Sequence, residues 1–183
     1  IMEDTHHVAL KGVQASDFAS KFSFEKGDLE IEMRREEMED IREMVECLDY
    51  RDKIEKLREW DRKGTVGAVA IDSEGRMAAA TSTGGVNGQL PGRIGDTPMP
   101  GCGTYCNSKA AVSATGVGEA IIKTTLARRT AEKIGNGKNP QEAVEKSLEF
   151  LKGKTGKEAG LISLDEKGRL GVDFNSKEMV YTG

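Results

Sequence analysis

The sequence predicts a layered α+β fold in which helices cover one face of an antiparallel sheet. Short apolar runs flank turn-forming residues at positions 72–75 and again at 165–168, which predicts one hairpin before and one after the central region. Two segments with helical spacing of apolar residues lie between these hairpins. Hairpin strands pair antiparallel and an amphipathic helix must bury one side, so this order favours helices packed together on one sheet face.

The composition is that of an ordinary globular domain, with 183 residues of which 37% are hydrophobic and 32% charged. The net charge of -4 and the lack of a clustered basic region argue against a nucleic-acid partner. No apolar run approaches the roughly 20 residues of a membrane-spanning helix, so we expect no membrane partner. Cys47, Cys102 and Cys106 cannot all pair within one chain, which favours a reducing, cytoplasmic location. Cys102 and Cys106 are spaced C-x3-C without a second pair or a nearby histidine, so a zinc site lacks ligands and we expect no metal. The sequence implies no organic cofactor.

Charged side chains of both signs fill 23 of the 36 positions from Asp28 to Lys63. Such a segment is typical of a solvated helix or helix pair with only a narrow buried stripe. The apolar residues expected to form this stripe are Met38, Ile41, Val45, Leu48, Ile54, Leu57 and Trp60.

The pattern changes from helical to alternating at Thr65. Five apolar runs predict strands, at Val66–Ile71, Met77–Thr83, Ala110–Ala114, Gly160–Leu164 and Leu170–Phe174. The glycine-rich and proline-rich stretch from Gly84 to Gly103 predicts a long loop.

Two helices are expected between the third and fourth of these strands. The first runs from Glu119 to Ile134, with Ile122, Leu126 and Ala127 facing inward and Gly135 ending it. For the second helix we expect an Asn139 cap, Pro140 at the first position, a capping-box Glu142 and an end at Gly153.

The Gly64-Thr65 step is the most informative feature for function. A chain cut there would begin with a threonine whose free α-amine can act as the base for its own hydroxyl, so one residue supplies both the nucleophile and the proton acceptor. This chemistry needs no histidine, and the chain has only His6 and His7, to which we assign no role. Taken alone, however, a threonine at a strand start is usually only a strand former.

Five short motifs follow in order from Thr65. They read TVGAVA, ATSTGG, PGRIGDTP, GCGTYCN and TGVGE, at Thr65–Ala70, Ala80–Gly85, Pro91–Pro98, Gly101–Asn107 and Thr115–Glu119. Each string is a weak signal by itself, but five in register are specific. This run resembles the plant-type asparaginase / isoaspartyl peptidase family of N-terminal nucleophile hydrolases, closely from Thr65 onward and loosely around residues 1–22.

The resemblance implies the catalytic residues. Thr65 matches the family nucleophile, released by autocatalytic cleavage of the bond between Gly64 and Thr65. Thr83 matches the threonine that hydrogen-bonds the nucleophile's amine and hydroxyl. Thr115 and Gly116 match the oxyanion hole, where preorganised donors stabilise the charge that develops on the attacked carbonyl oxygen.

The resemblance also implies the substrate contacts. Arg93 and Asp96 match the residues that hold the α-carboxylate and α-amine of an aspartyl group, which suits a guanidinium fork and a carboxylate. An ion pair that only pins the loop is the structural alternative for these two residues. The remaining positions expected at the substrate are Ile94, Gly95, Thr115, Gly116, Val117 and Gly118.

The family resemblance therefore implies an amidohydrolase that cleaves the side-chain amide of L-asparagine or the isopeptide bond of β-aspartyl dipeptides, acting as a homodimer of αβ units. Three alternatives stay open: a glycosylasparaginase, a threonine endopeptidase of the same superfamily, or a non-catalytic fragment or assembly module. The implied fold is an αββα sandwich, of which this chain would supply one sheet and its helical layer. We expect two parts, a charged upstream segment at 1–64 and a catalytic half at 65–183.

The family's upstream segment is more than twice as long as the 64 residues that precede Thr65 here, and it opens with a strand and an HGGAG-like loop. We therefore expect the chain to be part of a longer product and, alone, to expose apolar surface on its sheet.

Overall fold

The computed structural model describes residues 4–22, 24, 27–28, 31–46, 48–49, 52–53 and 64–183. The chain forms two compact units, Ile1–Glu36 and Glu37–Gly183. The second unit contains both sheets and the helices that cover them. All of the residues expected to carry chemistry lie in this second unit.

The described residues before Thr65 include the helix α1 (Gly12–Ala19), the 3-10 helix η1 (Ser20–Phe22) and the helix α2 (Glu32–Glu46). The first two were not predicted. The helix expected in the charged segment is present as α2, and Ile41 of the expected stripe is buried. Its last members, from Ile54 to Trp60, lie outside the described residues.

The strands that follow Thr65 form two separate antiparallel sheets rather than the single sheet expected. Strands β1 (Val66–Ile71) and β2 (Met77–Ser82) make a two-stranded sheet. Strands β3 (Thr104–Cys106), β4 (Ala110–Gly116), β5 (Ala159–Asp165) and β6 (Leu170–Phe174) make a four-stranded sheet in that order. Strand β3 was missed, because three residues beside a glycine-rich loop carry too little periodicity.

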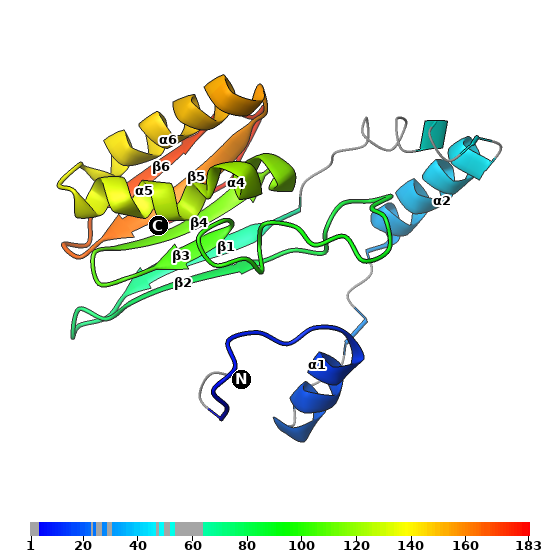
Figure 1. Ribbon diagram of the computed structural model, residues 1–183, viewed down its shortest axis with the longest axis horizontal. Coiled ribbons are helices and arrows are strands. Elements are labelled where there is room, and N and C mark those ends of the chain that lie inside the picture. Colours follow the sequence, from blue (N-terminus) through cyan, green and yellow to red (C-terminus); the bar gives the residue numbers. More distant parts are fainter. Residues whose placement is uncertain are drawn as a thin grey trace. The chain divides into compact units, whose positions relative to one another are not determined.

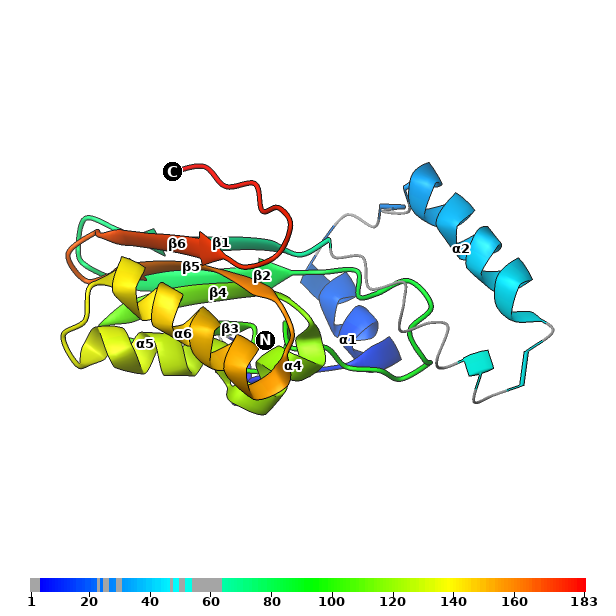
Figure 2. The same cartoon turned by 90° about the horizontal axis from the view of Figure 1, so that it is seen from above.

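One face of the four-stranded sheet is covered by helices, whereas β1 and β2 lie against its other face (Figures 1 and 2). The covering helices are α4 (Gly118–Thr124), α5 (Leu126–Gly135) and α6 (Pro140–Thr155). The second unit is therefore a helix-sheet-sheet stack, as an α+β fold requires. Its apolar core includes Val112, Ile121, Leu126, Ala127, Val144, Leu148, Leu151 and Leu161.

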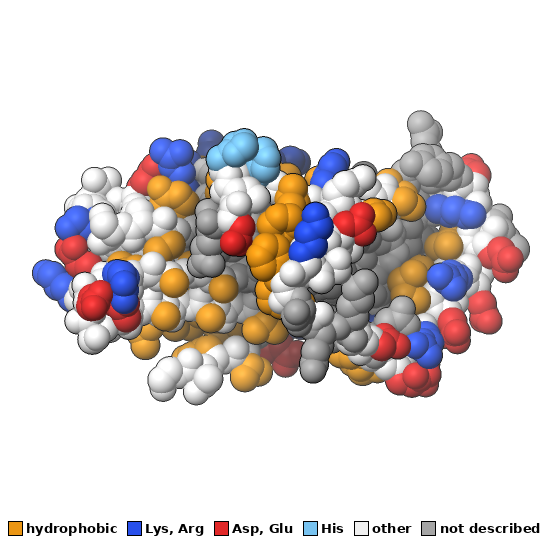
Figure 3. Space-filling model, turned by 90° about the horizontal axis from the view of Figure 1, so that it is seen from below, with side chains coloured by type: hydrophobic (Ala, Val, Ile, Leu, Met, Phe, Trp, Pro, Cys, Tyr) orange, Lys and Arg blue, Asp and Glu red, His pale blue; other side chains and the backbone are white. Residues whose placement is uncertain are grey.

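The two-stranded sheet buries only one of its faces. On the other face the side chains of Ala68, Ala70, Ala78 and Ala80 are exposed. Figure 3 shows small hydrophobic side chains scattered over backbone in its left half, where β1 and β2 lie in Figure 1. Small side chains on a flat sheet face are suited to close packing against another layer.

The single helix expected from Glu119 to Ile134 is interrupted. Thr125 has a φ of 45°, a left-handed conformation that ends α4 and starts α5 in a new direction. This is rare for a β-branched residue and has no local sequence signal. The expected inward residues Leu126 and Ala127 are buried, and α5 does end at Gly135.

The start of α6 was predicted correctly, but its details differ. Asn139 caps the helix, because its side-chain oxygen accepts from the Gln141 backbone N–H at 2.9 Å. Glu142 makes ion pairs with Lys138 and Lys146 rather than serving the expected capping box. The helix continues past Gly153 to Thr155, where Gly156 closes it in a left-handed conformation.

The two sheets approach most closely where Gly67 of β1 faces Ser113 of β4. A Cβ placed on Gly67 would lie 2.9 Å from the Ser113 Cβ and still nearer its hydroxyl. Thr81, the partner of Gly67 in β2, hydrogen-bonds the Ser113 hydroxyl at 2.7 Å. The distance between the sheets is therefore set by a glycine and a pair of hydroxyls.

We predict that Gly67→Ala lowers the free energy of unfolding by about 1–3 kcal/mol, because the added methyl overpacks this contact. Combining it with Ser113→Ala should cost less than the sum of the two single changes. Ala68→Ser, on the exposed face of the same strand, should change stability by less than about 0.5 kcal/mol. Chemical denaturation of the four variants tests this. Strict additivity would show that the two residues do not limit the sheet separation.

Candidate active site

The strand ends that carry the predicted catalytic residues gather at one end of the stack. The start of β1, the end of β2, the end of β4 and helix α4 lie at this end in both Figures 1 and 2. Thr65 is half-buried and directly precedes β1. The register pairs Val66 with Ser82, so continuing it by one residue sets Thr65 opposite Thr83.

Thr83 closes a local turn at the end of β2. Its hydroxyl accepts a hydrogen bond from the Gly85 backbone N–H at 3.1 Å, an arrangement typical of a threonine that starts a loop. Gly85 has a φ of 89°, which the turn requires and glycine adopts easily. The hydroxyl remains able to donate, since it acts here as the acceptor.

Thr115 and Gly116 form the last step of β4, where they pair with Gly160 and Ala159 of β5. Gly116 has a φ of 147°, and a Cβ on it would lie 2.7 Å from the Ala159 Cα. A side chain would therefore be excluded at Gly116 by both conformation and space.

The loop after β2 brings Arg93 to the first turn of α4. The Arg93 Nε donates to Glu119 Oε1 at 3.0 Å, and its Nη2 donates to Glu119 Oε2 at 3.2 Å. The Nη1 atom makes a longer contact of 3.4 Å with the side chain of Gln89. The hydrogen bonds from Arg93 also lower the pKa of Glu119, so this carboxylate stays ionised.

Asp96 lies in the same loop and is 8% exposed. Its backbone carbonyl accepts from the N–H groups of Met99 and Gly103, both at 3.0 Å, which fixes the loop around it. Burial raises the pKa of Asp96; its own backbone N–H and the nearby Arg93 charge lower it, and Glu119 raises it slightly. The buried carboxylate is thus poorly stabilised as an anion, a situation that a bound cation would relieve.

Gly118 is where Arg93 and Asp96 meet. A Cβ on Gly118 would lie 2.8 Å from the Arg93 Nη2 and 2.9 Å from the Asp96 Oδ1. Gly95 also contacts Arg93, with its Cβ position 2.9 Å from Nη1. The structure therefore brings a cation and a buried carboxylate, three residues apart in the sequence, against one glycine.

Two further residues expected at the substrate lie beside this group. Ile94 is 48% exposed, and Val117 is half-buried and packs against the apolar core. The Val117 backbone N–H donates to the Glu158 carbonyl at 3.3 Å.

Helix α2 contacts the loop that leads to Arg93, a contact that the sequence analysis did not find. The Asn87 side chain donates to the Glu37 carboxylate at 2.8 Å, and the Gly88 N–H lies 3.3 Å from the sulfur of Met38. The two sides of this contact are 50 residues apart, so no local pattern could have revealed it. The segment before Gly64-Thr65 therefore supports the loop that follows it.

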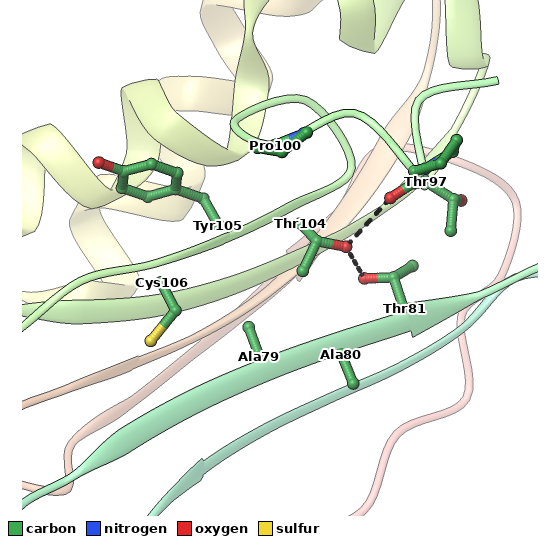
Figure 4. A pocket seen from close by; sticks show the side chains of 9 residues that line it. Ala79, Ala80, Thr81, Thr97, Pro100, Thr104, Tyr105 and Cys106 are labelled. Carbon is green, nitrogen blue, oxygen red and sulfur yellow. Dashed lines mark hydrogen bonds between the residues drawn. The ribbon is translucent and has the colours of Figure 1, made fainter. Parts of the chain in front are cut away.

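An open groove lies between the edges of β2 and β3, next to the Asp96 loop (Figure 4). Thr104 stands between Thr81, whose hydroxyl it contacts, and the Thr97 carbonyl, to which its hydroxyl donates at 3.4 Å. The Thr81 hydroxyl also contacts the Gly103 carbonyl at 3.3 Å. The groove contains none of the predicted site residues, but its hydroxyls connect the sheet contact at Ser113 to the loop of Asp96.

The residues that the structure describes include no cluster of three or more His, Cys, Asp or Glu side chains arranged to bind a metal ion. None of the helices described combines the length and hydropathy needed to cross a bilayer.

The chain is similar in sequence to proteins of one known family. The family described as Asparaginase matches residues 1–182. The chain is 38% identical to the plant-type L-asparaginase of Pyrococcus abyssi over 187 residues, covering 99% of this chain and 61% of that protein. It is 37% identical to the isoaspartyl peptidase/L-asparaginase of Danio rerio over 187 residues, covering 98% of this chain and 57% of that protein. It is 38% identical to the isoaspartyl peptidase of Escherichia coli over 185 residues, with 98% and 57% covered.

The chain thus spans about three fifths of the length of these relatives. The match nevertheless extends over nearly every residue present, including the loop of Arg93 and Asp96 and the end of β4. The chain belongs to the asparaginase family.

Proposed function

We propose that this chain carries the nucleophile and the aspartyl-binding residues of an amidohydrolase that acts on L-asparagine or on β-aspartyl dipeptides. The observation that supports this most is the meeting of Arg93 and Asp96 at Gly118. A guanidinium beside a buried carboxylate suits a zwitterion, with carboxylate to Arg93 and ammonium to Asp96. The names of the relatives, which include both asparaginases and isoaspartyl peptidases, point to the same substrates.

In this proposal the Thr65 hydroxyl first attacks the Gly64 carbonyl carbon, so that the peptide bond becomes an ester, and water then hydrolyses this ester to give a Gly64 carboxylate and a free Thr65 α-amine. The freed α-amine of Thr65 takes the proton of the Thr65 hydroxyl, whose oxygen attacks the side-chain amide carbon of the substrate. Thr83 hydrogen-bonds the amine and hydroxyl. The negative charge on the carbonyl oxygen is stabilised by Thr115 and the Gly116 N–H.

The amine of the substrate's side-chain amide then takes the proton from the Thr65 α-amine and leaves, as ammonia or as an amino acid. An ester remains between the Thr65 oxygen and the β-carbonyl of the substrate. Water, deprotonated by the same α-amine, attacks this ester and releases aspartate. Throughout, Arg93 and Asp96 hold the α-substituents of the substrate, so the reacting carbon stays positioned at Thr65.

We predict that the chain separates into fragments 1–64 and 65–183 on incubation, with threonine at the new N-terminus. Thr65→Ser should still be cleaved, because it keeps a hydroxyl nucleophile, whereas Thr65→Ala should stay intact. Intact-mass measurement tests this, with aspartate release from a β-aspartyl dipeptide as the assay of turnover. Cleavage that persists in Thr65→Ala would remove Thr65 from the mechanism. An uncleaved and inactive parent chain would favour the non-catalytic alternative.

We predict opposite effects of Asp96→Asn on binding and on stability. Affinity for L-aspartate should fall at least about tenfold, because a charged hydrogen bond to the ammonium is lost. Burial raises the pKa of Asp96 in the folded chain above 3.8, the ordinary pKa of an aspartate. As the pH rises from about 3.8 through the folded pKa, the unfolded chain loses this proton first, so ionisation of Asp96 lowers the free energy of unfolding. The variant should therefore gain stability relative to the parent over the same pH range.

Calorimetric titration and denaturation at several pH values measure these two effects. A variant that loses stability and keeps its affinity would show that Asp96 is a structural anchor of the loop.

We also predict that Gly118→Ala weakens L-aspartate binding about tenfold or more, because its methyl group displaces both Arg93 and Asp96. Gly153→Ala is the matched control: Gly153 lies in α6 with open space around its Cβ position. That change should leave binding unaltered and add about 0.5–1 kcal/mol of stability. Unchanged affinity of Gly118→Ala for L-aspartate would show that the ligand does not bind beside Gly118.

A further inference from the structure

The guanidinium of Arg93 presents two different pairs of donors, and among the described residues a carboxylate binds one of these pairs. The Nε and Nη2 atoms form the side-on pair, and both donate to the carboxylate of Glu119, at 3.0 and 3.2 Å. The Nη1 and Nη2 atoms form the end-on pair, where the one hydrogen bond that the described residues accept from the outward-facing side is the 3.4 Å donation from Nη1 to the side-chain oxygen of Gln89. A planar guanidinium can bind one carboxylate at each pair at the same time.

The two partners lie in different kinds of element. Glu119 belongs to the first turn of helix α4. Arg93 belongs to a loop with a φ of 85° at Gly92 and Gly95 on its other side, and the Arg93 side chain is only 18% exposed. Glu119 thus gives the mostly buried Arg93 side chain a bidentate partner that is carried by a helix.

We propose that Glu119 is a positioning residue, which holds the side-on donors of Arg93 so that the end-on donors face the α-carboxylate of an aspartyl substrate. This inference rests on the proposed function. It assigns Glu119 no contact with the substrate, and it makes the substrate carboxylate the second carboxylate on Arg93. A positioned fork loses less freedom when it binds, which favours affinity.

In the competing role, Glu119 occupies the donors of Arg93 that the substrate carboxylate itself would use. If the substrate carboxylate had to displace Glu119 from the side-on donors, removing the Glu119 charge would strengthen binding. If Glu119 positions Arg93, removing that charge weakens binding. The two roles therefore predict changes of opposite sign for the same variant.

The test is the affinity of Glu119→Gln and Glu119→Asp for three ligands, measured by NMR titration of the full chain. L-aspartate has both α-substituents, succinate lacks the ammonium, and β-alanine lacks the α-carboxylate. We expect Glu119→Gln to weaken L-aspartate and succinate about tenfold, with a smaller loss in Glu119→Asp, and to leave β-alanine unchanged. Asp96→Asn should give the complementary pattern, weakening L-aspartate and β-alanine but not succinate.

Glu132→Gln is the matched control. Glu132 also pairs with an arginine, through a 2.8 Å contact to the Nε of Arg128, and its side chain is 56% exposed, as is that of Glu119. It should alter none of the three affinities. A melting curve for each variant verifies that the chain remains folded.

Three results would overturn the inference. Tighter L-aspartate binding by Glu119→Gln would show that Glu119 is an occupant, and equal binding would show that it has no role. An equal loss for all three ligands would show a general disturbance of the loop. In each of these cases the parent still binds L-aspartate, so the proposed function survives. A parent chain that binds none of the ligands would instead overturn the proposed function and this inference with it.

Discussion

The contact of Gly67 with Ser113 and Thr81 is the constraint on which the second unit depends. Two sheets whose facing side chains were all of ordinary size would stand about 10 Å apart. Here a glycine in β1 lets β4 approach until the hydroxyl of Ser113 bonds to Thr81 of the neighbouring strand. The Thr81 hydroxyl is in turn hydrogen-bonded to that of Thr104 in β3. The Thr104 hydroxyl also donates to the carbonyl of Thr97, the residue after Asp96. The spacing of the sheets and the position of the Asp96 loop are thereby connected through one line of hydroxyls.

The line of contacts from Ser113 through Thr81 to Thr104 consists of hydroxyl groups, and this affects how strongly it fixes the arrangement of the two sheets. Hydroxyls that bond one another contribute little net stability, but a partner removed from a buried pair leaves an unsatisfied group that costs about 1–3 kcal/mol. Such contacts specify one arrangement strongly, because alternatives leave groups unpaired. Apolar stabilisation comes from the opposite face of the four-stranded sheet, where Val112 and Leu161 pack under the helices, and also from Ala111 and Leu164, which are buried on the same face as Ser113.

Sequence patterns predicted the elements whose signals are local. Strands β1 and β6 were predicted with their observed bounds, because alternation and flanking turns define them fully. The break at Thr125 was not predicted, since its left-handed conformation follows from how α4 and α5 pack rather than from the residues beside it. The division into two sheets was missed for a related reason: periodicity shows that a strand has a buried face but not which sheet it joins.

In the candidate site, too, residues with a local sequence signal were predicted and contacts between distant residues were not. Arg93 and Asp96 were identified by a short motif, and the structure brings them together at Gly118. Glu119 lay inside a motif but received no role, because its partner is 26 residues away and only the fold shows the pairing. The contact of Glu37 with Asn87 spans 50 residues and was likewise invisible to any local pattern.

The meeting of Arg93 and Asp96 at Gly118 has a consequence for handedness. Under the proposed function, a ligand carbon would carry one group fixed by a cation, a second fixed by an anion, and a third directed at Thr65. Three fixed directions around a tetrahedral centre define its chirality, since exchanging the first two sends the third away from the nucleophile. Because the cation and the anion differ in sign, neither can accept the other's group. Under the proposed function, charge alone would then reject the mirror image of the ligand, without a side chain that blocks it.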